Sequence, residues 1–298
     1  LDRGAAVDAR FLTSLGGGDE QQFPAGARRR ALAEAIVDPA NPLTRRVIVN
    51  WLGQQHFGKG IVPPPQHLGT RRELPTHPEL LDYLANRLLE DGWSLKSMHR
   101  RIMLTRVYQQ AARERPAARN ADPENRLFWR MPRRRLELEA MRDAMLAASG
   151  ELDPTHGGRP FELLTTPETP RRSVYAFINR DIVAPLMSTF DGANPNACTA
   201  KRPETQAPQQ TLFALNSTFI QDRAAAMAAA VMPPEANETH RVAGIRALYR
   251  RAYSRDPDRE ELAAAADYLQ NETHSTPQEA WQRLAHVLLA SNEFVFVD

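Results

Sequence analysis

The positions of proline and glycine constrain the fold of this chain more than any other feature of its sequence. Seven prolines and the pair Gly157-Gly158 fall between residues 151 and 206, which excludes a long helix there. On both sides of this segment, apolar residues recur at the three- and four-residue spacing of amphipathic helices. The sequence therefore predicts a mainly α fold with a loop-rich middle segment and at most a small β element.

The chain has 298 residues, 42% of them hydrophobic, and is large enough to bury a sizeable core. We expect one helical domain at residues 29–298, with a helical half at 29–150, the loop-rich segment at 151–206 and a second helical half at 207–298. Residues 1–28 contain three consecutive glycines, which predicts a linker or the remnant of a preceding domain.

Capping residues predict where several helices begin and end. One long helix is expected from Arg133 to Ser149, ended by Gly150, and a short strand from Ser173 to Ile178. The expected helix starts are Asn41-Pro42, a capping box at Thr76 to Glu79, Ser94, Asp122-Pro123, Pro208 and Asp256-Pro257.

Charge and cysteine content argue against several classes of function. The formal net charge of +2 is too small to indicate a nucleic-acid partner, and no run approaches the roughly 18 apolar residues of a membrane helix. Cys198 is the only cysteine, so no cysteine-built zinc or haem site is present, and the eight histidines lack zinc-protease spacing. We therefore expect neither metal nor other cofactor.

Ordered motifs along most of the chain resemble one known family. It is a domain of unknown function at the C-terminus of large secreted planctomycete and verrucomicrobial proteins, which often also carry a planctomycete-type cytochrome c domain. The resemblance implies an extracytoplasmic location, a cytochrome or other neighbouring domain as partner, and a context of polysaccharide breakdown, but no established activity. The motifs, within residues 29–297, are NPLTRRVIVN, HFGKGIV, PTHPELLDYLA, GWSLKSMHRRIMLT, DPENRLFWRMPRRRLELEAMRDAML, RRSVYAFINR and PQQTLFALN.

Matched residue by residue, the first family motif falls on Arg46, Asn50 and His56. The chain departs from the family pattern at two positions, because Trp51 stands where arginine is usual and Gly53 where tryptophan is usual. His56 also has a structural interpretation, in which it donates to a carbonyl at a helix end while Gly58 and Gly60 permit a left-handed turn.

The loop-rich segment is the expected location of a binding site. Within RRSVYAFINR, a strand would place Arg172 on one face and Arg171 and Tyr175 on the other, an arrangement suited to planar or anionic groups. We expect at least three arginines to line one cleft that accepts a sulfate or carboxylate of a glycan, with Asn50, His56 and Tyr175 as further candidates. The candidate arginines are Arg46, Arg171, Arg172, Arg180 and Arg202.

Three functions remain open from the sequence. The first is a binding or docking module for an anionic glycan or a neighbouring domain. The second is a glycan hydrolase or lyase that uses Asp181, Asp191 or Glu162 with arginines, and the third is a structural cap for an electron-transfer assembly. Two further patterns favour structural roles. Arg135, Glu139 and Arg142 are spaced to form ion pairs along one helix face or, as the alternative, a framework that holds other arginines in place. Gln210 and Asn216 are expected as ties between loop and helix.

Overall fold

The structure of the chain, a computed structural model, describes residues 8–15, 22–63, 74–163, 169–233, 237–273 and 275–297. Helices make up 54% of the chain and the described strands form a single two-stranded sheet, which confirms the predicted mainly α fold. The chain folds as two compact units, unit 1 ending at Pro132 and unit 2 running from Arg133 to Val297. Among the described helices, none has the length and apolar content needed to cross a membrane.

The boundary between the units differs from the composition boundaries at residues 150 and 206. The loop-rich segment belongs to the same unit as the helix before it and the helices after it. Its backbone is hydrogen-bonded to the side chains of Arg142 and Asp143 in the preceding helix. The predicted linker contains Gly16 to Gly18, which lie outside the described residues.

Unit 1 is built on three packed helices, with α2 against α3 and both against α4. Their apolar faces meet in a cluster that includes Val49, Leu88 and Met98, each almost fully buried. The elements of unit 1 are η1 (Thr13–Leu15), α1 (Arg28–Val37), α2 (Thr44–Phe57), α3 (Pro78–Glu90), α4 (Leu95–Met103) and α5 (Pro116–Ala121).

The two glycines after α2 have different roles. Gly58 has a φ of 71°, which a glycine adopts without a side-chain clash, and its N–H donates to the carbonyl of Gln54 at 2.7 Å. Gly60 provides space, since an added Cβ would lie 2.5 Å from Oδ1 of Asn50. Asn50 is fully buried and donates to the carbonyl of Val62 at 3.0 Å while accepting from its N–H at 2.9 Å. The left-handed turn is thus confirmed at Gly58, whereas Gly60 allows close packing.

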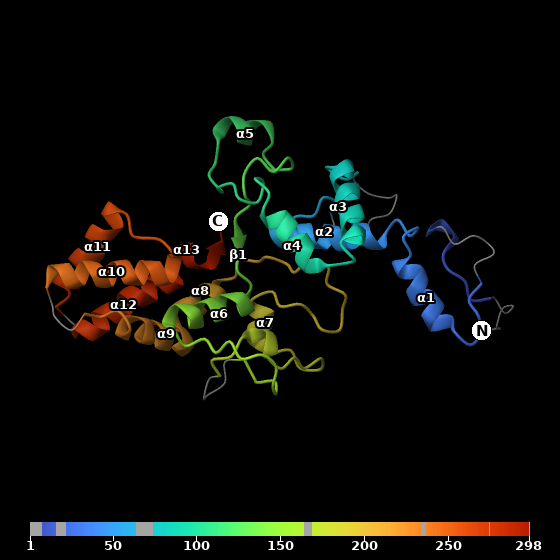
Figure 1. The fold of residues 1–298 in the computed structure, drawn as a ribbon. Coiled ribbons are helices and arrows are strands. Elements are labelled where there is room, and N and C mark those ends of the chain that lie inside the picture. Colours follow the sequence, from blue (N-terminus) through green and yellow to red (C-terminus); the bar gives the residue numbers. More distant parts are fainter. Residues whose placement is uncertain are drawn as a thin grey trace. The chain divides into compact units, whose positions relative to one another are not determined.

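Unit 2 is centred on α9 and α12, which lie side by side, with α6 and α10 packed against them (Figure 1). The core side chains Leu146, Ile220, Met227, Ile245 and Leu289 are completely buried. The elements of unit 2 are β1 (Arg134–Arg135), α6 (Leu138–Ser149), η2 (Ser173–Tyr175), α7 (Pro185–Thr189), α8 (Pro208–Asn216), α9 (Thr218–Ala229), α10 (Glu238–Tyr253), α11 (Arg259–Asn271), α12 (Pro277–Ala290), α13 (Asn292–Val295) and β2 (Phe296–Val297).

The small sheet of unit 2 joins its first residues to its last. Strands β1 and β2 are antiparallel, with Arg134 opposite Val297 and Arg135 opposite Phe296. The N–H of Leu136 adds a hydrogen bond to the carbonyl of Val295 at 2.7 Å.

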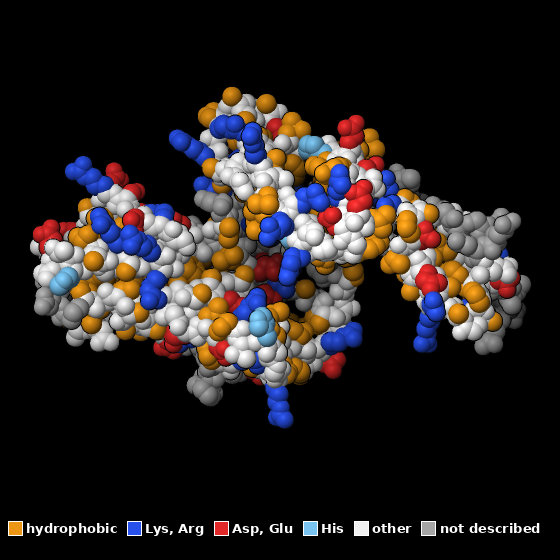
Figure 2. All heavy atoms as spheres, in the orientation of Figure 1, with side chains coloured by type: hydrophobic (Ala, Val, Ile, Leu, Met, Phe, Trp, Pro, Cys, Tyr) orange, Lys and Arg blue, Asp and Glu red, His pale blue; other side chains and the backbone are white. Residues whose placement is uncertain are grey.

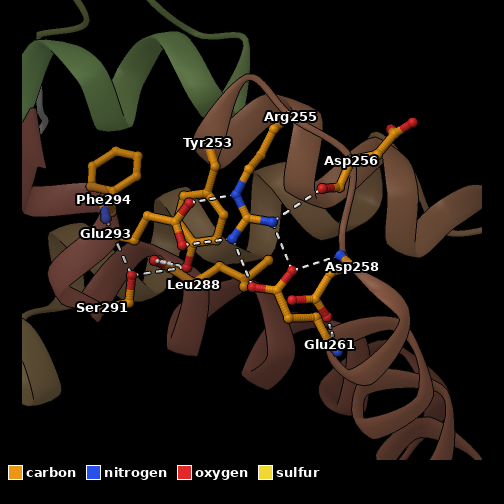
Figure 3. A network of polar contacts seen from close by, with 9 residues as sticks. All are labelled: Tyr253, Arg255, Asp256, Asp258, Glu261, Leu288, Ser291, Glu293 and Phe294. Carbon is orange, nitrogen blue, oxygen red and sulfur yellow. Dashed lines mark hydrogen bonds and ion pairs between the residues drawn. The ribbon is translucent and has the colours of Figure 1, made fainter. Parts of the chain in front are cut away.

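Arg255 connects three helices at one end of unit 2 (Figure 3). Its guanidinium donates to the carboxylates of Glu261 on α11 and Glu293 on α13, with N···O distances of 2.6 to 2.7 Å. The guanidinium also lies 5.4 Å from the ring centroid of Tyr253, at the end of α10. The hydrogen bond from Arg255 lowers the pKa of Glu261. These contacts fix how the chain turns from α10 into α11.

Several helix ends lie where the capping residues in the sequence predict them. The hydroxyl of Ser94 accepts from the N–H of Ser97 at 3.2 Å, Gly150 ends α6 in the left-handed conformation, and α8 begins at Pro208. The start near Asp256-Pro257 is two residues early, since Asp258 caps α11 in a capping box with Glu261.

Other local predictions were wrong. Thr76 does not cap α3, because the residue in the cap position is His77; the Thr76 hydroxyl donates to the carbonyl of Ile61 at 3.2 Å. Asp122 follows α5 instead of starting a helix, and its carboxylate accepts from two backbone N–H groups in the next turn. The helix expected from Arg133 begins at Leu138, because the residues before it pair with β2. The strand expected at Ser173 is a 3₁₀ turn, since its first N–H is held by a carboxylate of α6.

Candidate binding surface on the loop-rich segment

A buried arginine of α6 anchors the loop-rich segment. Arg142 is only 2% exposed, and its guanidinium donates to the carbonyl of Arg171 at 2.9 Å, to the hydroxyl of Ser173 at 3.2 Å and to the carbonyl of Thr169. It also lies 5.3 and 5.6 Å from the ring centroids of Phe161 and Phe219. A charge buried this deeply is tolerated when its N–H groups find acceptors, and here backbone carbonyls supply them.

The next residue of α6 fixes the same loop from a second side. The carboxylate of Asp143 accepts from the N–H of Ser173 at 2.8 Å and from its hydroxyl at 2.7 Å. Ser173 is itself buried, and the N–H of Phe177 bonds to the carbonyl of Phe161 at 2.8 Å. The backbone from residue 169 to residue 177 is therefore held by hydrogen bonds along most of its length.

Large apolar side chains are exposed on this anchored segment and on the residues directly after it. Val174 is 67% exposed and Ile182 is 73% exposed, with Phe177 and Ile178 about half exposed. The side chain of Arg172 is also about half exposed, and its nearest carboxylate, on Asp143, is 4.0 Å away. We call this group the 172–182 surface: Arg172, Val174, Phe177, Ile178 and Ile182.

Arg171 and Tyr175 lie together beside the 172–182 surface. The guanidinium of Arg171 is 4.9 Å from the centroid of the Tyr175 ring and donates to the carbonyls of Gly157 and Arg159. The hydroxyl of Tyr175 is 3.2 Å from Nδ1 of His156. Arg171 and Tyr175, which the strand pattern placed on one face, are therefore in contact.

Arg202 connects the far end of the loop-rich segment to the start of α6. It makes a forked pair with Glu139, both N···O distances being 2.9 Å, and lies 3.3 Å from Glu137. Arg135 precedes the helix and donates to Gln210 and to the carbonyl of Thr205. The expected ladder of Arg135, Glu139 and Arg142 along one helix face is therefore wrong. Glu139 instead holds another arginine, Arg202, as the alternative predicts.

Lowering the pH is expected to weaken the Arg202–Glu139 anchor. Burial opposes ionisation of Glu139, but hydrogen bonds from Arg202 outweigh it and lower the pKa of Glu139 below its ordinary value of 4.5. A carboxyl with a lower pKa in the folded state stabilises the fold above its unfolded pKa, and that contribution is lost as the pH falls through the folded value. Glu139→Gln should reduce stability at pH 7 and flatten its decline between about pH 5 and pH 3.

Urea unfolding at a series of pH values tests this expectation. Glu204→Gln is the matched control, since the Glu204 side chain is 65% exposed in its pair with Lys201. An acid dependence that is the same in Glu139→Gln as in the wild type would contradict the assignment.

Arg180 and the candidate carboxylates have local roles. Nε of Arg180 donates to Oδ1 of Asn196 at 3.3 Å. Asp191 accepts from the N–H and the hydroxyl of Thr205 at 2.8 and 2.7 Å, which fastens a turn. Asp181 is exposed.

The candidates from the first family motif belong to unit 1. Nε of Arg46 donates to Asp82 at 2.6 Å, beside a cavity of about 90 Å³ that Arg45 also lines. Asn50 is the buried clamp on Val62 described above. Nε2 of His56 lies 2.8 Å from Nδ1 of His99.

Gln210 is the tie between loop and helix that its position predicts. It accepts from Arg135 at 2.7 Å and donates to the carbonyl of Thr189 at 2.8 Å. Asn216 bonds to the carbonyl of Leu212 within its own helix.

The sequence did not single out the exposed apolar side chains, Asp143 as the clamp on Ser173, or the burial of Arg142. The one sequence signal for this clamp is the adjacent charged pair Arg142 and Asp143 within the largely apolar helix segment MRDAML. On the face drawn in Figure 2, lysine and arginine side chains are scattered and do not form one broad basic patch.

Residues 28–269 match the family PSD1, described as a protein of unknown function (DUF1553). No curated protein and no solved structure matches the chain. The matched span covers most of both units. The chain therefore belongs to the PSD1 family of proteins of unknown function.

Proposed function

We propose that the chain is a protein-docking module that binds an acidic and apolar surface of a partner protein through the 172–182 surface. The observation that carries this proposal is the exposure of Val174 and Phe177 on a backbone held by hydrogen bonds with Arg142, Asp143 and Phe161, with Ile178 and Ile182 exposed directly after it. Exposed apolar groups on an ordered segment are a common feature of interaction sites.

A fixed backbone favours binding because fewer conformations are lost when the partner arrives. The hydrogen bonds of this segment with Arg142, Asp143 and Phe161 are made within the free chain, so their ordering cost is met during folding. Aromatic and arginine side chains, such as Phe177 and Arg172, are also enriched among residues that dominate binding energy.

The charge of the segment indicates an acidic partner. Residues 171–182 contain three arginines and one acidic residue, Asp181. Arg171 donates to carbonyl oxygens and Arg180 to an amide oxygen, so both bond to neutral groups. Carboxylates on a partner would supply complementary charge at this edge.

Glycan binding and glycan cleavage receive less support from the same geometry. Arg46 and Arg202 are engaged by Asp82 and by Glu139, and Asp191 fastens Thr205. The family resemblance adds an extracytoplasmic location and a cytochrome c or other domain of a parent chain as the candidate partner to the docking proposal.

Peptide selection tests the docking proposal even though the partner is unidentified. A phage library of random 15-residue peptides would be selected on the immobilised protein, and the enriched peptides would be measured by fluorescence anisotropy. We expect peptides that combine Asp or Glu with aromatic or aliphatic residues. Phe177→Ser and Arg172→Ala should each weaken their binding at least about tenfold, as interface hot spots do.

Val287→Ser is the control, because Val287 is an exposed apolar residue on α12. Selected peptides that bind both surface variants as well as the wild type would overturn the proposal. Sulfated or carboxylated oligosaccharides that raise the melting temperature of the wild type but not of Arg172→Ala or Arg180→Ala would replace it with a glycan site.

A further inference from the structure

A separate cavity in unit 2 lies among the start of α10, the end of α11 and the start of α12. Its volume is about 380 Å³, which is in the range of small-molecule sites. Leu269, Met232 and Trp281 provide apolar walls, while Arg241, Glu272 and Ser275 provide polar ones. Glu272, Ser275 and Trp281 lie beyond residue 269, where the family match ends.

Two polar groups of this cavity have no partner among the described residues. The side chain of Arg241 makes no hydrogen bond or ion pair there, although the other guanidiniums discussed above are engaged. The hydroxyl oxygen of Ser275 is buried without a hydrogen-bond partner in the described chain. A guanidinium in this state on a cavity wall indicates a ligand that supplies acceptors.

The third polar group carries the opposite charge. The carboxylate of Glu272 is 14% exposed and forms an ion pair with Arg283 at an N···O distance of 3.8 Å. An arginine and a glutamate on the wall of one apolar cavity match a ligand that carries both a carboxylate and an ammonium group.

The position of the indole depends on a glycine of α10. A Cβ added to Gly244 would lie 2.6 Å from Cη2 of Trp281. Gly244 therefore lets the indole pack against the helix, and Trp281, only 6% exposed, becomes the apolar wall of the cavity.

We infer that this cavity binds a free apolar amino acid, such as leucine or phenylalanine. The ligand carboxylate pairs with Arg241, its ammonium group with Glu272, and its side chain lies against Trp281 and Leu269. This inference is independent of the 172–182 surface, which involves none of these residues.

Fluorine NMR of protein labelled with 5-fluorotryptophan tests the inference. The chain has four tryptophans, and Trp281→Phe assigns the signal of Trp281. L-phenylalanine and L-leucine should shift this signal saturably. 3-Phenylpropionate lacks the ammonium group and phenethylamine lacks the carboxylate, so each should bind at least tenfold more weakly than phenylalanine.

Arg241→Gln should weaken phenylalanine binding at least tenfold. Its control is Arg246→Gln, at an exposed position on the same helix. Since Arg241 has no described partner, its replacement should leave the melting temperature of the free protein unchanged. No shift of the Trp281 signal at 10 mM of either amino acid would overturn the inference. Equal affinity in Arg241→Gln, or equal affinity for 3-phenylpropionate, would also overturn it.

Discussion

Replacing Arg142 with alanine should destabilise unit 2 by about 3 to 5 kcal/mol, the usual cost of breaking a buried charged network. The substitution leaves the carbonyls of Thr169 and Arg171 without their donor and opens a void between Phe161 and Phe219. At roughly 2 to 4 °C per kcal/mol for a unit of this size, the melting transition should fall by about 6 to 20 °C.

Unfolding of unit 2 can be followed separately through Trp281, since the other three tryptophans precede residue 133. Hydrogen exchange should also accelerate at residues 169–177. Arg142→Lys should remain destabilising, because an ammonium group cannot reach all the acceptors that the guanidinium bonds. Arg172→Ala is the matched control, with an expected change within about 0.5 kcal/mol, because its side chain is half exposed. A loss that is equally small for Arg142→Ala would show that Arg142 does not anchor the loop.

Asn50→Ala should destabilise unit 1 by about 2 to 4 kcal/mol. It would leave both the N–H and the carbonyl of Val62 buried without partners, at about 1 to 3 kcal/mol each. Gly60→Ala should cost about 1 to 3 kcal/mol, because the new methyl group would displace the Asn50 side chain.

A double-mutant cycle separates this packing effect from a backbone effect. With Asn50 reduced to alanine, the added methyl at position 60 gains room, so most of the penalty of Gly60→Ala should vanish. Gly53→Ala on α2 is the control, since nothing lies within 4 Å of its added Cβ. It should stabilise the helix by about 0.5 to 1 kcal/mol. Fluorescence of the tryptophans in unit 1 would report unfolding, and strictly additive losses would contradict the assigned contact.

Local signals in the sequence were sufficient for the helical class and for several helix ends. Ser94 and Gly150 act through groups three or four residues away, so their roles can be inferred from neighbouring positions. Thr76 has an equally good capping sequence, yet α3 begins one residue later, and the N–H and hydroxyl of Thr76 both donate to the carbonyl of Ile61, 15 residues away. Such a long-range contact is not visible along the chain.

The candidate surface depended on contacts at longer separations. Arg142 meets acceptors 27 to 31 residues away, and Arg202 pairs with a glutamate 63 residues away. These sequence separations are longer than the repeat of a helix or a strand, so the sequence pattern does not show which arginines are buried. Which of them anchor a loop and which are exposed depends on the tertiary fold. Anion binding by Arg46, Arg171, Arg172, Arg180 and Arg202 stays a prediction.

The pairing of β1 with β2 determines how unit 2 responds when its two ends are pulled apart. The chain enters and leaves this unit through two antiparallel strands whose outer residues, Arg134 and Val297, are opposite each other. Tension applied between these two ends would peel the ladder open one hydrogen bond at a time, ending with the bond from Leu136 to Val295. The helices around α9 and α12 would carry little force until this last hydrogen bond breaks. The strand pair should therefore open at low force while the core stays folded.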